Sequence, residues 1–256
     1  MKIAVFSDTH NKHKKISLPQ CDIAIFAGDA TSLGQKHEMD SFLKWYGKQE
    51  QCTHKILVAG NHDRSFDSKF FYTFEDHDLF EENFSKGKPG WLLEMLDYQS
   101  VSNNLYYLEN SFKVVEGLKI WGSPITPSFH RQHWAFNADR NEEIRKYWDL
   151  IPTDADIVIT HGPVYGKLDY VPESQEFTGC VDLKDKIESV APKIFICGHI
   201  HSGRGVSYDG KTLYVNSAIV DNSYQIQGDP MIIEFDVEKR KVGLFDELEK
   251  VTYFYS

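Results

Sequence analysis

Short runs of consecutive apolar residues recur along the chain, and they predict strands that are buried on both faces. The first runs are Lys2–Phe6, Asp22–Ala27 and Lys55–Ala59. Between the last two lies Gln35–Gln51, whose apolar residues are spaced three and four positions apart and predict a helix. Because uninterrupted apolar strands occur mainly in parallel sheets covered by helices, this order predicts an α/β fold.

The same alternation returns in the second half of the chain. Asp156–Thr160 and Lys193–Cys197 predict strands, and Val181–Val190 predicts a helix between them. A further helix is predicted over Arg140–Leu150. Hairpins are predicted at Phe112–Trp121, around the Asp209-Gly210 turn and over Met231–Phe245.

The segment Phe66–Tyr98 interrupts this alternation. It is rich in aromatic and acidic residues, and it predicts helical pieces with the aromatic rings in the core and the acids in solvent. No repeat, low-complexity tract or linker divides the chain. We therefore expect a single domain over residues 1–256.

Polar residues that can bind metals follow directly after five of the predicted strands. In chain order they are Asp8 with His10, Asp29, Asn61 with His62 and Asp63, His161, and His199 with His201. In an α/β sheet the carboxyl ends of the parallel strands form the edge where ligands bind. We therefore expect these side chains to gather at one place.

Seven of these residues make a ligand set of imidazole, carboxylate and amide groups, namely Asp8, His10, Asp29, Asn61, His161, His199 and His201. This mixture suits Mn, Fe, Zn, Co or Ni, and it fits poorly with calcium, which prefers oxygen ligands throughout. So large a set exceeds what one tetrahedral ion takes, and it predicts two divalent ions that share a carboxylate. Two ions about 3.5–4 Å apart are the usual arrangement for displacement at phosphorus.

Each short motif also has an ordinary structural explanation. Gly28-Asp29 and Gly60-Asn61 are common in turns, and a lone His161 is more often a hydrogen-bonded core residue than a ligand. Five such motifs, each placed after a strand, would rarely arise together by chance. The metal site is therefore the favoured interpretation.

The charge of the chain narrows the class of substrate. Its 256 residues include 28 Lys and Arg against 38 Asp and Glu, which gives a formal net charge of -10. This balance argues against an extended nucleic-acid surface, which needs clustered Lys and Arg. It leaves open a small phosphate ester or nucleotide, because bound metals would supply the positive charge locally.

Other features bear on the location of the protein. No stretch approaches the roughly 20 apolar residues of a membrane span, and the early run Ile3–Phe6 is too short for a signal peptide. The 4 cysteines are widely separated and form no CxxC pair. We expect a soluble, cytoplasmic protein with no membrane partner.

The ordered motifs together resemble the calcineurin-like metallophosphoesterase superfamily. They are Asp8-x-His10, Gly28-Asp29, Gly60-Asn61-His62-Asp63, His161 and Gly198-His199-x-His201. Within this superfamily, the chain is similar to the class III cyclic-nucleotide phosphodiesterases and the animal metallophosphoesterase-domain-containing proteins. The segments that carry this closer likeness are Trp121-Gly122-Ser123-Pro124, Thr160-His161-Gly162-Pro163, Gly179-Cys180 and Gly198-His199-Ile200-His201. The resemblance covers roughly residues 1–236, and it implies a four-layer αββα sandwich with two mixed β-sheets.

The resemblance also implies which residues hold each metal. Asp8, His10, Asp29 and His201 would hold the first ion, and Asp29, Asn61, His161 and His199 the second, with Asp29 as the bridge. Manganese is the expected metal, with Fe, Zn, Co or Ni as alternatives. Ser/Thr phosphatases of the superfamily continue the Gly-Asp motif with Asp-Arg-Gly. This chain continues with Ala30-Thr31-Ser32 and has no Arg there, which disfavours a phosphoprotein substrate.

His62 and Asp63 are the expected catalytic residues. A hydroxide that bridges the metals would attack phosphorus in line. His62 would protonate the leaving oxygen or donate to the phosphate, because neighbouring side chains diverge and Asn61 is already a ligand. Asp63 would orient the His62 ring, although a role in the turn or as a helix cap explains it equally well.

The predicted substrate-binding residues are Asn61, His62, Arg64 and Arg204. The two arginines lie beside metal motifs and would hold a second phosphate or a base, unless they are solvated loop residues. A second segment near the Trp-Gly-Ser-Pro motif predicts either the wall of a nucleotide pocket or a surface loop. Its residues are His130, Arg131, His133 and Trp134.

The favoured function is that of a dinuclear-metal-dependent phosphoesterase acting on small phosphodiesters, with cyclic nucleotides as the expected substrates. The alternative is a nuclease or a broad phosphomonoesterase that uses the same centre. A scaffold that has lost catalysis is disfavoured, because all seven expected ligands are present.

Overall fold

Most of the apolar runs become strands of two sheets that pack face to face. The computed structural model describes residues 1–67, 104–129, 134–246 and 251–255. The first sheet has 7 strands in the order β17-β16-β15-β1-β2-β3-β4. Its strands are β1 (Lys2–Phe6), β2 (Cys21–Ala27), β3 (Cys52–Val58), β4 (Leu105–Tyr107), β15 (Met231–Asp236), β16 (Lys241–Asp246) and β17 (Val251–Tyr255).

The second sheet has 6 strands in the order β13-β14-β12-β9-β6-β5. They are β5 (Ser111–Val115), β6 (Leu118–Ser123), β9 (Ile157–Thr160), β12 (Ile194–Cys197), β13 (Gly205–Tyr208) and β14 (Leu213–Asn216). Two short ribbons lie outside the sheets, β7 (Thr126–Pro127) with β8 (Asn137–Ala138) and β10 (Tyr170–Val171) with β11 (Glu176–Phe177). Both large sheets are mixed, because antiparallel strands flank parallel central ones.

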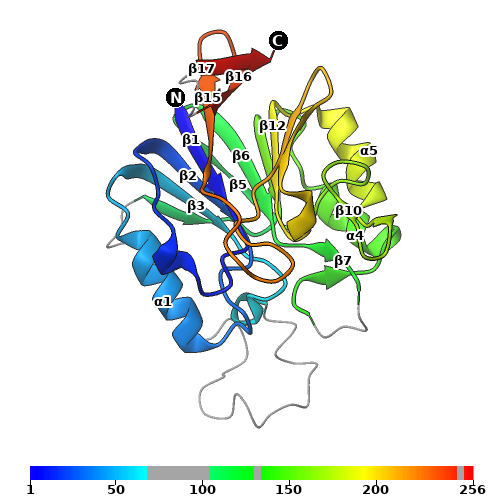
Figure 1. Cartoon of the computed structure of the whole chain (residues 1–256). Helices are drawn as coiled ribbons and strands as arrows, with labels where there is room; N and C mark the ends of the chain where they lie inside the picture. The colour runs from blue at the N-terminus through cyan, green and yellow to red at the C-terminus, as the bar shows by residue number, and fades with distance from the viewer. Residues whose placement is uncertain (68–103, 130–133, 247–250, 256) are drawn as a thin grey trace.

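Helices cover the outer face of each sheet. Helix α1 (Lys36–Gly47) lies against the first sheet, and α4 (Glu142–Trp148) and α5 (Val181–Val190) lie against the second (Figure 1). The described layers are therefore helix, sheet, sheet, helix, which confirms the αββα sandwich. None of the described helices is long and apolar enough to cross a membrane.

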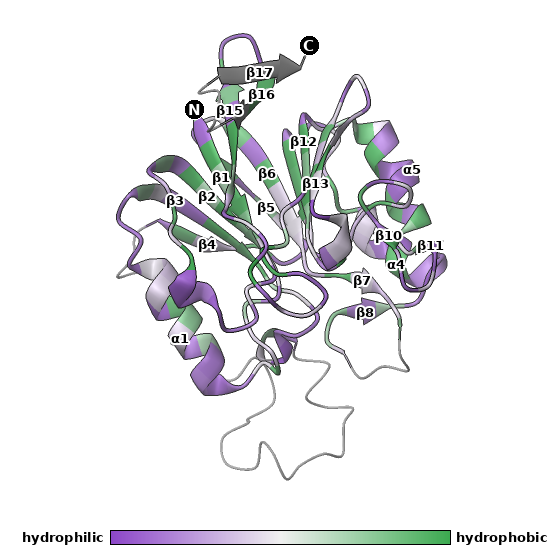
Figure 2. Ribbon diagram, in the orientation of Figure 1, coloured by the Kyte–Doolittle hydropathy of each residue, from purple (hydrophilic) through white to green (hydrophobic). Residues whose placement is uncertain are grey.

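Alternate residues of each strand enter different parts of the core. Ile3 and Val5 of β1 join a cluster between the two sheets, with Ile157 and Ile159 of β9. Phe6 points the other way, and its ring contacts that of Tyr46 of α1 at a centroid distance of 5.6 Å. Both strand faces are therefore apolar (Figure 2), which is why the sequence reads as runs rather than as an alternation.

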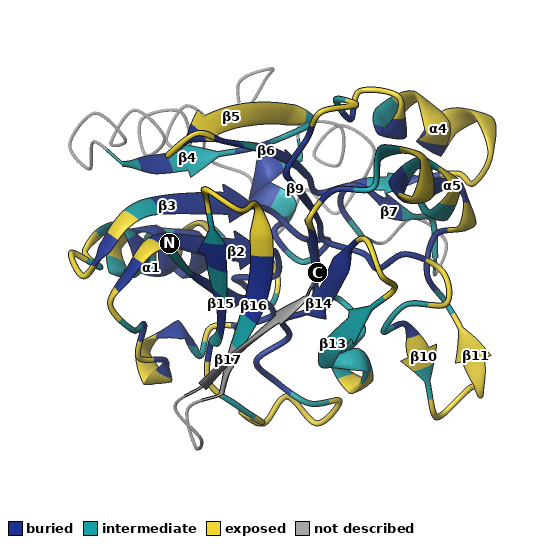
Figure 3. Ribbon diagram, turned by 90° about the horizontal axis from the view of Figure 1, so that it is seen from above, coloured by how far each residue is buried: buried dark blue, intermediate teal, exposed yellow. Residues whose placement is uncertain are grey.

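Burial falls off toward the rim of the sandwich. Seen from above, the central strands are buried, whereas strand β5, the β10–β11 ribbon and the outer faces of α4 and α5 are exposed (Figure 3). The interior of the two sheets is thus closed to solvent, and the ends of the central strands are the places where polar side chains emerge.

Two predicted helices are shorter than the sequence pattern indicated. Helix α1 ends at Gly47 rather than Gln51, because the carbonyl of Gln51 accepts the amide of Cys21 and starts the pairing of β3 with β2. Helix α4 begins at Glu142 rather than Arg140, because Asn141 has a φ of 74° and cannot continue a right-handed helix.

Other differences concern short elements. Helix α5 has the predicted bounds, and the three predicted hairpins are formed by β5–β6, β13–β14 and β15–β16. Strands β4 and β17 and the two ribbons were not predicted. Strand β4 and the ribbon strands have only two or three residues, too few to show a periodicity. Of the aromatic segment 66–98, residues 68–98 lie outside the described part, and Phe66 ends a short 3-10 helix.

Tyr46 provides a test of how α1 is fixed to the first sheet. Its hydroxyl lies 2.9 Å from the Ala24 carbonyl and 3.1 Å from the Ile56 carbonyl, and the residue is fully buried. We expect Tyr46→Phe to lower the free energy of unfolding by about 1–2 kcal/mol, because a buried hydrogen bond is lost. Urea unfolding measures the change, and Tyr165→Phe, at a partly exposed ring, is the control. Equal unfolding midpoints for both variants would contradict the expectation.

Candidate metal centre

Five strand ends bring the predicted polar residues together at one edge of the sandwich. Strands β1, β2 and β3 of the first sheet deliver residues 7–10, 28–29 and 60–63, and β9 and β12 of the second deliver residues 161 and 198–201. Asp8 and Asp29 sit in these turns with φ values of 54° and 59°, and their exposed fractions are 0% and 2%. The turns therefore place two buried carboxylates between the sheets.

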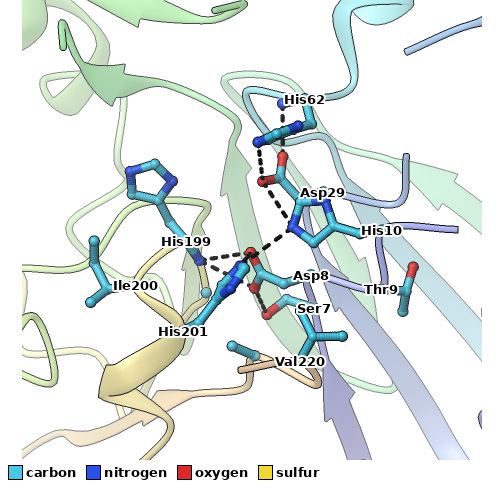
Figure 4. A network of polar contacts seen from close by, with 12 residues as sticks. Ser7, Asp8, Thr9, His10, Asp29, His62, His199, Ile200, His201 and Val220 are labelled. Atoms are coloured by element: carbon cyan, nitrogen blue, oxygen red, sulfur yellow. Dashed lines mark hydrogen bonds and ion pairs between the residues drawn. The ribbon is translucent and has the colours of Figure 1, made fainter. Parts of the chain in front are cut away.

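The first group of side chains contains Asp8, His10 and His201. The Nε2 atom of His201 lies 3.5 Å from Oδ1 of Asp8 and 3.3 Å from Nε2 of His10. His10 in turn lies 3.7 Å from Oδ2 of Asp29 (Figure 4). One divalent ion could contact Asp8, His10 and His201, since their ligand atoms lie within 4.8 Å of one another, and His10 links this group to Asp29.

The second group contains Asp29, His161 and His199. The Nε2 atom of His161 lies 3.3 Å from Oδ2 of Asp29 and 3.0 Å from Oδ1 of Asn61. Asp29 thus belongs to both neighbourhoods, as a shared carboxylate would. Its other oxygen, Oδ1, accepts the backbone amide of His62 at 2.8 Å, which fixes the orientation of the carboxylate.

Backbone carbonyls orient three of the imidazoles. In each ring Nδ1 lies near a carbonyl oxygen and donates to it, so Nε2 is the nitrogen that faces the carboxylates and can bind a metal once it carries no proton. The pairs are His10 with Thr31 at 3.1 Å, His161 with Ala27 at 2.9 Å and His201 with Asp221 at 3.0 Å. Metal-binding histidines are held in this way, so the residues fit a metal centre.

The two carboxylates stay ionised although they are buried. Burial acts to raise the pKa of Asp29, but His161 and His62 outweigh it and hold that pKa well below the ordinary value. Burial also acts to raise the pKa of Asp8, but the contact with His201 outweighs it, so that this pKa is lowered too. The amide of His199 also donates to Asp8 at 3.0 Å.

The imidazoles divide into two kinds by charge. Burial lowers the pKa of His10 to about 4 and that of His199 to about 3, so both rings are neutral at pH 7. His161 is also buried, but the charge of Asp29 raises its pKa to about 9, and Asp8 raises the pKa of His201. Metal binding at pH 7 therefore has to displace the proton of His161.

Two glycines allow the carboxylates their positions. A Cβ atom on Gly198 would overlap Oδ2 of Asp8 and Oγ of Ser7. A Cβ atom on Gly60 would overlap the backbone nitrogen and Oδ1 of Asp29. The motif glycines are thus required because the backbone passes directly against the carboxylates.

His62 lies at the rim of the site. Its Nε2 atom is 4.0 Å from Oδ2 of Asp29, and its Nδ1 atom is 2.6 Å from the Ser32 carbonyl. The ring packs on Trp134 at a centroid distance of 4.1 Å, and Arg64 lies over the same indole at 4.9 Å. His62 also groups with His10 and Asp29 closely enough to share a metal with them.

Of the two roles expected for Asp63, its contacts correspond to the one in the turn and not to the one of orienting His62. The atom that orients the His62 ring is the Ser32 carbonyl, and the Asp63 carboxylate instead accepts the amides of Ala30, Thr31 and Gly60. Asp63 is buried, and burial raises its pKa to about 6. It joins the turn after β2 to the turn after β3, and so acts on the position of Asp29 rather than on His62.

The other predicted substrate-binding residues are placed as follows. The guanidinium of Arg204 donates to the carbonyls of Ala218 at 2.7 Å and Asp229 at 2.5 Å, so it braces the segment after β14. Arg64 begins the short helix after β3. Residues 130–133, with His130, Arg131 and His133, lie outside the described part of the chain.

The sequence patterns did not identify Tyr224 or Asp221 as parts of the site. The Tyr224 ring lies against His10 and His201, and the Asp221 carbonyl holds His201. Both residues come from a long loop after β14 with no motif of its own. Only an aromatic residue within that loop could have drawn attention to it.

A family model and the sequences of related proteins both identify the family of this chain. A family model described as calcineurin-like phosphoesterase matches residues 1–203. The chain is 39% identical over 230 residues to human Metallophosphoesterase domain-containing protein 1, covering 89% of this chain and 69% of the human protein. It is 30% identical over 234 residues to UPF0046 protein K07C11.7 of Caenorhabditis elegans, covering 91% and 74% of the two chains.

A solved structure shares the fold. Phosphopantetheinyl hydrolase (PptH) from Mycobacterium tuberculosis superposes with a TM-score of 0.54 at 12% identity, over 87% of this chain and 90% of that one. At this identity the likeness concerns the arrangement of the layers alone.

Gly198 provides a test of the close packing around Asp8. We expect Gly198→Ala to lower the metal content of the purified protein to less than half, because the added Cβ displaces the Asp8 carboxylate. Elemental analysis after reconstitution with Mn²⁺ measures the loss. Gly47→Ala is the control, since its Cβ would meet no atom within 4 Å. Full metal content in Gly198→Ala would contradict the expectation.

Proposed function

Since this chain belongs to the calcineurin-like phosphoesterase family, we propose that it hydrolyses small phosphodiesters with two bound divalent metal ions. Cyclic nucleotides are the first substrate class of this proposal. The observation that supports it most directly is the grouping of two buried, ionised carboxylates with inward-facing imidazole nitrogens at one sheet edge.

In this proposal Asp29 is shared by two metal sites. Asp8, His10 and His201 complete the first site, and Asn61, His161 and His199 complete the second. Manganese is the proposed metal, with Fe, Zn, Co or Ni as alternatives, since all of them accept mixed nitrogen and oxygen ligands. Two such ions would lower the pKa of a water molecule and neutralise the charge of the phosphoryl oxygens. The predicted single domain and cytoplasmic location remain predictions.

His62 is the proposed proton donor. Its Nδ1–H is held by the Ser32 carbonyl, and its ring is held by Trp134, so Nε2 faces the side of the site next to Asp29. When protonated at Nε2, the ring can give that proton to the oxygen that leaves phosphorus. Because the ring is anchored at Nδ1, it does not have to reorient during the reaction.

The overall proposal is tested by a substrate panel with the Mn²⁺-loaded protein. It comprises 2′,3′- and 3′,5′-cyclic nucleotides, phosphomonoesters, short single-stranded DNA and phosphopeptides. We expect the cyclic nucleotides to have the highest kcat/KM, because a net charge of -10 disfavours long polyanions. Hydrolysis of phosphopeptides alone would refute the diesterase assignment. Hydrolysis of single-stranded DNA in preference to all small esters would refute the small-substrate assignment and favour the nuclease alternative.

A second test concerns His62. We expect His62→Ala to keep both metals and to lower kcat for diesters with alkoxide leaving groups by about 10²–10⁴-fold, because those groups need a proton. For bis-p-nitrophenyl phosphate, whose leaving group is a weak base, the loss should stay below about tenfold. Steady-state kinetics on both substrates measure the difference, with Asp40→Asn as the surface control. Equal losses on the two substrates would exclude the role of proton donor.

A further inference from the structure

Tyr224 is an aromatic residue beside the candidate metal centre that the proposed mechanism does not use. Its ring lies 4.9 Å from the His10 ring and 5.5 Å from the His201 ring, between centroids. Both contacts are nearly perpendicular, with interplanar angles of 85° and 86°. The residue is 43% exposed, so a large part of its surface faces solvent next to these imidazoles.

The contact with His10 makes Tyr224 one end of a row of rings. His10 also contacts His62 at 4.7 Å, and His62 contacts Trp134 at 4.1 Å. The aromatic row therefore consists of Trp134, His62, His10 and Tyr224 in spatial order. Its inner members are residues of the site, and its outer members are large rings at opposite ends.

The loop that carries Tyr224 is held firmly. The amide of Tyr224 donates to the Asp221 carbonyl at 2.8 Å, and the Asp221 carboxylate accepts the amides of Ser223 and Gln225. Tyr224 itself has a φ of 57°, a conformation that residues other than glycine seldom adopt. Such conformations persist where the surrounding structure fixes them, and they are concentrated at functional sites.

The same loop is fixed to the metal centre. The Asp221 carbonyl holds Nδ1 of His201 at 3.0 Å, so one residue orients a candidate ligand and anchors the turn of Tyr224. Asn222 donates to Glu173, between β10 and β11, at 2.6 Å. The Tyr224 ring is therefore placed relative to the centre by backbone and side-chain bonds on two sides.

The chemistry of the ring suits an uncharged partner. A tyrosine side chain carries no charge near pH 7, so the ring does not repel a phosphate. When an apolar group covers an exposed aromatic ring, apolar surface is removed from water, and this lowers the free energy of binding.

We propose that Tyr224 contacts an ester substituent of the substrate and selects phosphate esters that carry a planar, apolar group over those with small alkyl groups. The inference rests on the proposed function, since it specifies which substituents the same site accepts. The geometry that supports it is a fixed, partly exposed ring at the end of the aromatic row.

Binding of two phosphonates tests the proposal without catalysis. We expect the Mn²⁺-loaded protein to bind phenylphosphonate more tightly than methylphosphonate, and Tyr224→Ala to reduce that preference about three- to tenfold, as expected for loss of one ring contact. Tyr224→Phe should keep it, because the ring remains. Tyr170→Ala is the control, at a tyrosine that is 42% exposed and packs on Phe177. Calorimetric titration gives the dissociation constants.

Three results would overturn the proposal. The first is equal affinity of the unaltered protein for the two phosphonates, and the second is an unchanged ratio of the two affinities in Tyr224→Ala. The third is a loss of bound manganese in Tyr224→Ala, which would mean that the ring acts only through His10 and His201. The substrate panel and the phosphonate titration can fail separately. If the protein hydrolyses no diester but Tyr224→Ala abolishes the phenyl preference, the proposed function is wrong and the contact with the ligand stands.

Discussion

Two carboxylates buried between the sheets impose the central constraint on this structure. Asp8 and Asp29 are almost inaccessible to solvent, and an isolated charge in such a place is strongly unfavourable. Imidazoles and backbone amides compensate for the lost hydration, since His161 and the amide of His62 contact Asp29, and His201 contacts Asp8. Any bound cation would replace the compensating protons, so the same arrangement that keeps the carboxylates ionised prepares them to bind metal.

The position of the strands follows from this constraint. The amide of Gly198 donates to the His161 carbonyl at 2.9 Å and joins two turns of the second sheet. The amide of Ser7 donates to the Ser217 carbonyl at 3.1 Å and joins the turn after β1 to the segment after β14 of the other sheet. Asp63 makes a further link, between the turns that follow β2 and β3. The packing of the two sheets and the geometry of the site are therefore one problem, because the site lies where the turns of both sheets meet.

Much of the fold and of the site could be predicted from local patterns. The apolar runs identified β1, β2, β9 and β12 because strands buried on both faces are apolar throughout. Short strands such as β4 (Leu105–Tyr107) could not be found, since three residues carry no periodicity. The partner of His62 could not be predicted either. Ser32 contacts the ring through its backbone carbonyl, which every residue type has, so the sequence does not indicate this contact.

The sequence by itself determined the layered α/β fold, the family motifs and the types of candidate ligand, because each depends on residue identity within a few positions along the chain. Only the tertiary structure decided which carbonyl orients each imidazole, why Gly60 and Gly198 lie against the carboxylates, and that Tyr224 stands beside His10. The physical reason is that these relations join segments from different strand ends. Their distances are set by how the two sheets pack, and no local pattern encodes that packing.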